Sequence, residues 1–234
     1  MTADFKVKAV IPASGTGTRF GGKTPKQFLP ICGEPILKRT LEVYESCSFV
    51  DEIAVSVPEG YIEQVRGYGF HKLKHVVKGM SARADSVFAA LKAIDPFDGV
   101  VLVHDGVRLF VTEELIKSVA CEAYEHGAAI AAVPILETVK LADKNGLVAD
   151  TPDRKMLWRA QTPQGFRYGM ILRAYEQAAK DGVLHEATDD SYLVERLGLP
   201  VRLVEGDVLN MKITSKQDFL LAEALIISKD KGRI

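Results

Sequence analysis

Four short apolar runs, each followed directly by turn-forming residues, constrain the fold of this chain more than any other feature. They lie at 7–11, 53–57, 100–103 and 128–133. Runs that are short and apolar throughout are typical of parallel strands covered on both faces. Segments with helical spacing of apolar residues lie at 35–44, 81–94 and 112–126, the last opened by Thr112 as a helix cap. Strands that alternate with helices predict a Rossmann-like, doubly wound α/β fold with a mostly parallel sheet.

One segment interrupts this alternation. Residues 139–150 place Asn145-Gly146 between two extended stretches, which is a strong hairpin signal. A two-stranded hairpin is marginally stable alone, so we expect it to pack on the body or to reach a partner subunit. With no linker to a second domain, we predict one domain over 1–234, with a protruding β-hairpin arm at 136–155. The tail at 215–227 has the pattern of an amphipathic helix whose capping box joins Ser215 and Asp218.

The composition excludes several classes of partner and site. The 234 residues include 30 basic and 31 acidic side chains, so charge gives no reason to expect nucleic acid as a partner. Cys32, Cys47 and Cys121 lack CxxC spacing, which argues against a disulfide framework and a structural zinc site. The first residues contain no apolar stretch long enough for a signal peptide or a membrane span. We therefore expect no membrane partner and a cytoplasmic location.

A glycine-rich stretch at 12–22 follows the first predicted strand, and small residues there let backbone N–H groups approach phosphates. The dinucleotide pattern GxGxxG fails because Phe20 occupies the third position. The P-loop pattern GxxxxGK[ST] matches formally from Gly17 to Thr24. It is disfavoured because Pro25 keeps Thr24 out of the first helical turn that a P-loop threonine occupies. It stays an alternative, since 100–105 has the pattern of a Walker B strand.

A third interpretation uses the whole stretch. Gly15 and Gly17 are followed by Arg19, and Lys26 comes seven residues later. This arrangement resembles the signature of sugar-phosphate nucleotidyltransferases. The resemblance implies a glycine loop around a nucleoside triphosphate, with Arg19 and Lys26 neutralising its phosphates.

Further segments extend this resemblance over about residues 7–225. They are GMSARADSV at 79–87, VHDGVR at 103–108, QTPQ at 161–164, TDD at 188–190, and an ending at 206–214 that contains NMKIT. Together they are similar to the 2-C-methyl-D-erythritol 4-phosphate cytidylyltransferases of isoprenoid biosynthesis. The resemblance implies a nucleotide-diphospho-sugar transferase type of fold. It also implies that a sugar-alcohol phosphate attacks the α-phosphorus of CTP, with Mg²⁺ bound and pyrophosphate released. Attack of one anion on another needs charge neutralisation and positioning more than a covalent nucleophile.

The resemblance also assigns the site residues. The catalytic cations would be Arg19, Lys26 and Lys212. The nucleotide would be bound by Ala13, Ser14, Gly15, Gly17, Met80, Ser81, Ser86 and Asp105, and Asp105 would also hold the metal. The acceptor would be bound by Arg108, Thr138, Arg154, Thr162 and Thr188. In this family the arm crosses into a twin subunit, so the resemblance implies a homodimer in which Thr138 and Arg154 serve the other chain. We expect His104 to orient the turn at Asp105, the other histidines to lie at the surface, and Trp158 to be a core or positioning residue.

Some residues depart from the family pattern. Ser14, Met80 and Ser81 replace the usual alanine, glycine and acidic residue, which leaves the strictness of CTP selection open. Val107 also occurs in the ribitol 5-phosphate cytidylyltransferases, so that activity is the main alternative. A nucleotide-binding regulator without catalysis is another. The presence of Arg19, Lys26, Asp105 and Lys212 together argues against the regulator.

Overall fold

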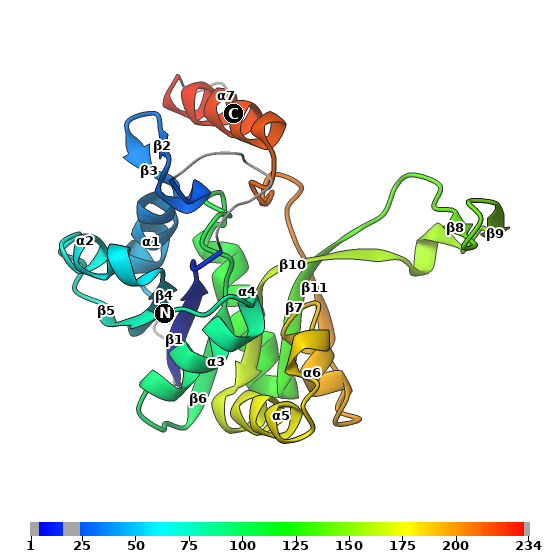
Figure 1. Cartoon of the computed structure of the whole chain (residues 1–234), viewed down its shortest axis with the longest axis horizontal. Helices are drawn as coiled ribbons and strands as arrows, with labels where there is room; N and C mark the ends of the chain where they lie inside the picture. Colours follow the sequence, from blue (N-terminus) through cyan, green and yellow to red (C-terminus); the bar gives the residue numbers. More distant parts are fainter. Residues whose placement is uncertain (1–4, 16–23, 232–234) are drawn as a thin grey trace.

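A seven-stranded sheet forms the centre of the molecule in the computed structural model, which describes residues 5–15 and 24–231 (Figure 1). Its strands are β1 (Lys6–Pro12), β4 (Glu52–Val57), β5 (Leu73–Lys78), β6 (Gly99–Val103), β7 (Ala128–Pro134), β10 (Trp158–Arg167) and β11 (Arg202–Glu205). They are ordered β11-β7-β10-β6-β1-β4-β5, and every neighbouring pair is parallel except the two pairs that β10 makes with β6 and β7. The predicted α/β fold with a mostly parallel sheet is confirmed.

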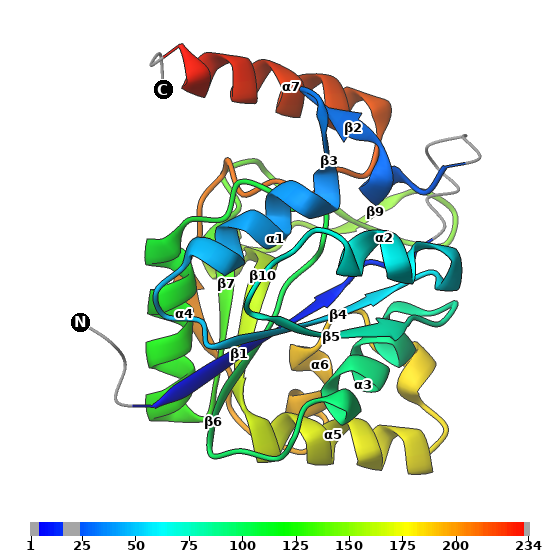
Figure 2. The same ribbon diagram turned by 90° about the vertical axis from the view of Figure 1, so that its left-hand side faces the viewer.

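Helices cover both faces of the sheet, as the apolar strands require. Figure 2 shows one set on each side. The first set is α1 (Ile36–Ser46), α2 (Ile62–Arg66) and α4 (Glu113–His126). The second set is α3 (Arg83–Ala93), α5 (Tyr168–Lys180) and α6 (Ser191–Glu195). Thr112 caps α4 as predicted, since its Oγ1 accepts from Leu115 N at 3.2 Å.

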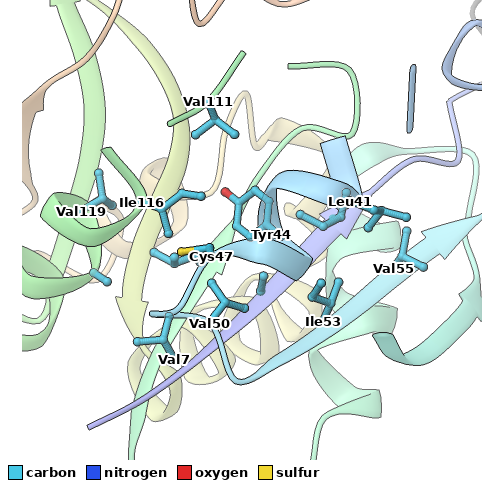
Figure 3. Packing of buried hydrophobic residues seen from close by; sticks show 14 of the residues in the cluster. Val7, Leu41, Tyr44, Cys47, Val50, Ile53, Val55, Val111, Ile116 and Val119 are labelled. Atoms are coloured by element: carbon cyan, nitrogen blue, oxygen red, sulfur yellow. The ribbon is translucent and has the colours of Figure 1, made fainter. Parts of the chain in front are cut away.

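The core on the first face connects directly to the residues behind the candidate site. Figure 3 shows Tyr44 of α1 in the middle of this cluster, with Ile116 on one side and Leu41 on the other. Its ring lies 5.1 Å from that of His104, which directly follows β6. The turn after β6 therefore packs directly against the apolar core on this face of the sheet.

The C-terminal helix α7 (Lys216–Asp230) lies over the short β2 (Pro30–Ile31) and β3 (Glu34–Pro35) pair (Figure 1). The predicted capping box is confirmed between Ser215 and Asp218. The predicted amphipathic pattern is wrong. Ala222 and Ile226 pack into a small cluster, but Leu220 is 65% exposed and Leu221 is exposed as well. Phe219 and Leu225 are half-buried against the same cluster, so apolar side chains of α7 lie both on its buried side and in solvent.

The hairpin arm is confirmed. Strands β8 (Leu141–Ala142) and β9 (Val148–Asp150) pair antiparallel, and Figure 1 shows them far out from the sheet at the end of a long extension of β7 and β10. Gly146, with φ of 81°, takes the left-handed conformation in the connecting turn. The arm exposes large apolar side chains to solvent, namely Leu136, Leu141, Leu147, Val148 and Met156.

Candidate functional site

The loop after β1 forms the first wall of the site, and the structure describes it as far as Gly15. Ala13 N donates to Ser56 O at 2.8 Å, which holds the loop against β4. The buried side chain of Gln27 donates from Nε2 to Ala13 O at 2.6 Å and to Gly15 O at 3.0 Å. Gln27 therefore fixes the course of the loop, a role that the sequence analysis did not assign.

The P-loop alternative is excluded by the segment that follows. Thr24 and Pro25 lie outside any helix, and Pro25 precedes only a single 3₁₀ turn at Lys26–Phe28. A P-loop lysine and threonine open a longer helix instead. Lys26 Nζ donates to Ile213 O at 2.7 Å, which joins the start of the chain to the segment before α7.

A serine pair closes the wall on the side of β4 and α3. The hydroxyls of Ser14 and Ser86 lie 2.5 Å apart, and Met80 N donates to Ser86 Oγ at 2.9 Å. Gly79 permits this approach because a Cβ there would lie 2.2 Å from Ser14 Cβ. The Met80 side chain, by contrast, is 53% exposed. The structure thus brings three of the predicted nucleotide-binding residues, Ser14, Met80 and Ser86, together through their hydrogen bonds.

Asp105 lies in the turn after β6 at the centre of an ionic cluster. Its Oδ1 accepts from Arg83 Nε at 3.1 Å, and its Oδ2 lies 3.2 Å from Arg108 Nε and 3.0 Å from Lys212 Nζ. Arg83 also pairs with Asp190 at 2.7 Å. Three cations and two carboxylates leave one net positive charge on the cluster.

The three cations set the ionisation of Asp105. Burial alone would raise its pKa, but Arg83, Lys212 and Arg108 outweigh burial and hold the pKa of Asp105 well below its usual range. Asp105 is therefore ionised at neutral pH. The carboxylate keeps Arg108 and Lys212 directed toward one point.

His104 fixes the turn that carries Asp105, as predicted. Its Nδ1 accepts from Thr162 Oγ1 at 3.1 Å, and its Nε2 donates to Arg108 O at 3.0 Å. Asp105 N in turn donates to Thr162 Oγ1 at 3.1 Å. Burial lowers the pKa of His104 to about 4, so the ring is neutral at pH 7. The Thr162 hydroxyl, predicted to bind the acceptor phosphate, is thus occupied in holding the turn.

Two adjoining cavities contain most of the predicted site residues. The larger, of about 350 Å³, is lined by Ala13, Ser14, Gly15, Lys26, Gln27, Ser81, Arg83, Asp105, Val107, Lys212 and Thr214 among others. The smaller, of about 280 Å³, is lined by Arg83, Asp105, Arg108, Ala160, Gln161, Thr162, Gln164, Thr188, Asp189 and Lys212. Lys26, Asp105 and Lys212, which are far apart in the sequence, therefore share one cleft. Arg83, Asp105 and Lys212 line both cavities and so mark the place where they meet.

Other predicted residues lie elsewhere. Arg19 and Gly17 fall outside the residues that the structure describes. Thr138 and Arg154 lie exposed on the arm, where Arg154 Nη1 donates to Leu136 O at 2.7 Å, and they line neither cavity. Trp158, expected in the core or in a positioning role, is 38% exposed at the base of the arm, so a core position is wrong.

The other four histidines were expected at the surface, and three of them lie there. His71, His126 and His185 are exposed, whereas His75 is half-buried. His75 Nε2 lies 2.9 Å from Glu52 Oε1 across the β4–β5 pair.

The described residues do not form a ready site for a resident metal. No group of three or more histidine, cysteine, aspartate or glutamate side chains among them is placed to hold an ion. Asp105, predicted as a metal ligand, is the carboxylate that the larger cavity offers, and three cations already share it. A protein-held Mg²⁺ usually has one or two carboxylates and gains its other ligands from phosphates and water. The metal role of Asp105 stays a prediction.

The sequence model of the family described as "IspD: 2-C-methyl-D-erythritol 4-phosphate cytidylyltransferase" matches residues 7–228. The chain belongs to this family. It is 45% identical over 222 residues to the 2-C-methyl-D-erythritol 4-phosphate cytidylyltransferase of Symbiobacterium thermophilum, covering 94% of this chain and 92% of that protein. It is 46% identical over 231 residues to the protein of the same name from Geobacter metallireducens, covering 95% and 98%.

Solved structures of this family have the same fold. The 4-diphosphocytidyl-2C-methyl-D-erythritol synthase of Anaerococcus prevotii superposes with a TM-score of 0.84 at 31% identity, covering 95% of this chain and 96% of that one. The 2-C-methyl-D-erythritol 4-phosphate cytidylyltransferase of Thermus thermophilus gives 0.78 at 34% identity, covering 94% and 98%. In the described part of the chain, no helix has the length and apolar character needed to span a membrane.

Proposed function

We propose that this protein joins CTP to 2-C-methyl-D-erythritol 4-phosphate, giving CDP-methylerythritol and pyrophosphate. The observation that carries the proposal is the convergence of Lys26, Asp105 and Lys212 on a cleft that continues into a second cationic cavity. Two anionic substrates need two adjoining pockets with shared positive charge between them. The names of the relatives supply the identity of both substrates.

The two cavities suit different substrates. We place the triphosphate of CTP in the larger cavity, along the loop that ends at Gly15 and beside Lys26. The acceptor phosphate then occupies the smaller cavity, where Arg108 and Thr188 line the wall. The two phosphates meet at Asp105 and Lys212, the shared wall.

The reaction there is a displacement at phosphorus. An oxygen of the acceptor phosphate forms a bond to the α-phosphorus of CTP. The bond from that phosphorus to the oxygen bridging to the β-phosphorus breaks, and its electron pair leaves with pyrophosphate. Lys26 and Lys212 stabilise the charge that grows during this step, while Asp105 holds Lys212 and Arg108 in place. Arg19 is assigned to the same task from the sequence.

Magnesium enters this proposal as part of the substrate. Among the described residues, the larger cavity provides Asp105 as its one carboxylate, and three cations share it. We therefore propose that Mg²⁺ arrives bound to the phosphates of CTP. The chain's own residues then bind the phosphates and position them.

We further propose a homodimer in the cytoplasm. The arm exposes a row of apolar side chains, including Leu147 and Val148, that a second copy would cover. Thr138 and Arg154 lie on the same arm, so an arm that crosses to a twin subunit would bring them to that subunit's smaller cavity. Three free cysteines, two of them exposed, suit a reducing compartment.

The test of the reaction is pyrophosphate release by purified protein with CTP, Mg²⁺ and methylerythritol phosphate. A parallel reaction with ribitol 5-phosphate decides the main alternative. Val107, the residue shared with the ribitol enzymes, is buried and packs with Phe110 and Ile213. It also lines the larger cavity, which we assign to CTP, and so it gives no preference between the two acceptors. Turnover with ribitol phosphate alone would overturn the substrate assignment, and no turnover with either would favour a regulator.

Lys26→Ala tests the role of the cleft. We expect kcat to fall by about 10²-fold or more, since a cation that stabilises growing phosphate charge is removed. The melting temperature should change little, because Lys26 lies in a short 3₁₀ turn outside the core and its hydrogen bond to Ile213 O is only part-buried. Lys180→Ala, an exposed lysine in the last turn of α5, is the matched control and should keep its activity. Equal losses of stability and activity in Lys26→Ala would contradict this role.

A further inference from the structure

We propose that Arg83 is a further catalytic residue for this reaction, and that Asp190 and Tyr175 are positioning residues that hold it in place. The inference rests on the proposed function and adds residues to which the sequence analysis gave no role. Arg83 is the first residue of α3, directly above the carboxyl ends of the central strands. Such an edge is where ligands bind in doubly wound sheets.

The location of Arg83 is the first observation. Arg83 lines both cavities and shares this property with Asp105 and Lys212. Its side chain is 29% exposed, so part of the guanidinium faces the cleft. A cation at the boundary between the two cavities lies where the acceptor phosphate and the α-phosphate of CTP come together.

The hydrogen bonds of the guanidinium are the second observation. Nε is bound to Asp105 Oδ1 at 3.1 Å and Nη2 to Asp190 Oδ2 at 2.7 Å. Nη1 of Arg83 has no hydrogen-bond or ion-pair partner among residues 5–15 and 24–231. Two anchored nitrogens fix the plane of the group, and the third keeps its N–H donors for a phosphate oxygen.

Asp190 supplies the third observation. It is completely buried, and both of its oxygens are used: Oδ2 by Arg83 and Oδ1 by the hydroxyl of Tyr175 at 2.5 Å. Gln164 Oε1 accepts from Asp190 N at 3.0 Å and ties this segment to β10. A buried carboxylate is costly unless it is paired. Its pairing here is with one cation, and that cation reaches the cleft.

The chemistry that Arg83 would perform follows from this geometry. As the acceptor oxygen bonds to the α-phosphorus and the bond to pyrophosphate breaks, negative charge spreads over the non-bridging oxygens of the α-phosphate. Arg83 would donate from Nη1 to one of these oxygens. Burial lowers its pKa, but Asp190 and Asp105 more than compensate, so the guanidinium stays charged throughout.

The experiment compares Arg83→Lys, Asp190→Asn and Tyr175→Phe with wild type in the pyrophosphate assay, with kcat and both KM values measured. For Arg83→Lys we expect kcat to fall about 10²-fold. Lysine keeps the charge, but its single nitrogen cannot bind both carboxylates and also donate to a phosphate oxygen in a fixed plane. For Asp190→Asn we expect kcat to fall by a similar factor, because Arg83 would lose its anchor and misplacing a catalytic group has an effect of that size. Tyr175→Phe should lower kcat less, and KM for CTP should change by less than about threefold in all three.

The matched control is Tyr168→Phe. Tyr168 is also a buried tyrosine of α5, but its hydroxyl bonds to Leu91 O and Ile94 O, away from the cleft. It should lose stability comparable to Tyr175→Phe and keep its kcat. Parallel effects of the two tyrosine variants on kcat, or an unchanged kcat in Arg83→Lys, would overturn the inference and leave the proposed function intact. An inactive wild-type protein would overturn both.

Discussion

His104 allows a quantitative test of how the buried turn is held. The perturbation is a decrease in pH from 7 to 5, applied to wild type and to His104→Gln. In the folded protein His104 is completely buried, with Nδ1 accepting from Thr162 and Nε2 donating to Arg108 O. A second proton would have to be placed on Nδ1, where the Thr162 hydroxyl now donates. Protonation therefore disrupts the turn that carries Asp105.

The magnitude follows from the pKa. Burial lowers the pKa of His104 from 6.5 to about 4, so the unfolded chain binds a proton that the folded chain does not bind between these values. The stabilisation is fully present above pH 6.5 and is lost as the pH falls toward 4. Linkage over this interval gives a loss of about 2 kcal/mol in the free energy of unfolding between pH 7 and pH 5.

The assay is urea unfolding at pH 7, 6 and 5. His104→Gln should be less stable at pH 7, but its free energy of unfolding should fall by about 2 kcal/mol less than that of wild type by pH 5. His185→Gln, which replaces an exposed histidine, controls for the loss of a histidine from the chain. If wild type and His104→Gln lose stability in parallel, the neutral buried ring is not the cause and the reasoning is refuted.

Two further predictions concern packing. Ile226→Ala should lower the free energy of unfolding by about 2–4 kcal/mol, because Ile226 lies on the buried side of α7. Ile227→Ala, at the neighbouring exposed position, should change it by less than about 1 kcal/mol. Equal effects in denaturant titrations would show that α7 does not pack as described. Gly79→Ala should push Ser14 away, since the new Cβ would lie 2.2 Å from the Ser14 Cβ. We expect a higher KM for CTP in steady-state assays, and an unchanged KM would mean that Ser14 does not contact the nucleotide.

The sequence predicted the parts of the sheet that are apolar on both faces and missed the rest for a physical reason. Strands β1, β4, β6 and β7 are buried except at some end residues, so their composition alone identifies them. β10 carries Gln161, Thr162 and Gln164, whose side chains build the site, and its pairing with β7 shifts register between Ala160 and Gln164. β11 is an exposed edge strand. A strand that contributes polar side chains to the site, or that lies exposed at the sheet edge, has no continuous apolar run by which its sequence could be recognised.

The candidate site was predictable at the level of motifs but not of contacts. Resemblance located Lys26, Asp105 and Lys212, and the structure places them in one cleft. The partnership of Arg83 with Asp190 joins residues 107 positions apart, and spacing in the sequence contains no information on such a pair. Gln27 was missed because its role is to bind loop carbonyls, which any buried amide could do.

The position of the arm has a consequence for how this molecule can vary. Trp158 of β10 pairs directly with Pro134 of β7, and the two strands are antiparallel neighbours in the sheet. The arm is therefore, in topological terms, an enlarged turn of an ordinary β-hairpin. The length and tip of the arm can change without reordering any strand of the sheet. The whole segment between residues 134 and 158 could also be removed without such a change. The proposed contact between subunits could therefore diverge while the sheet that carries the site stays the same.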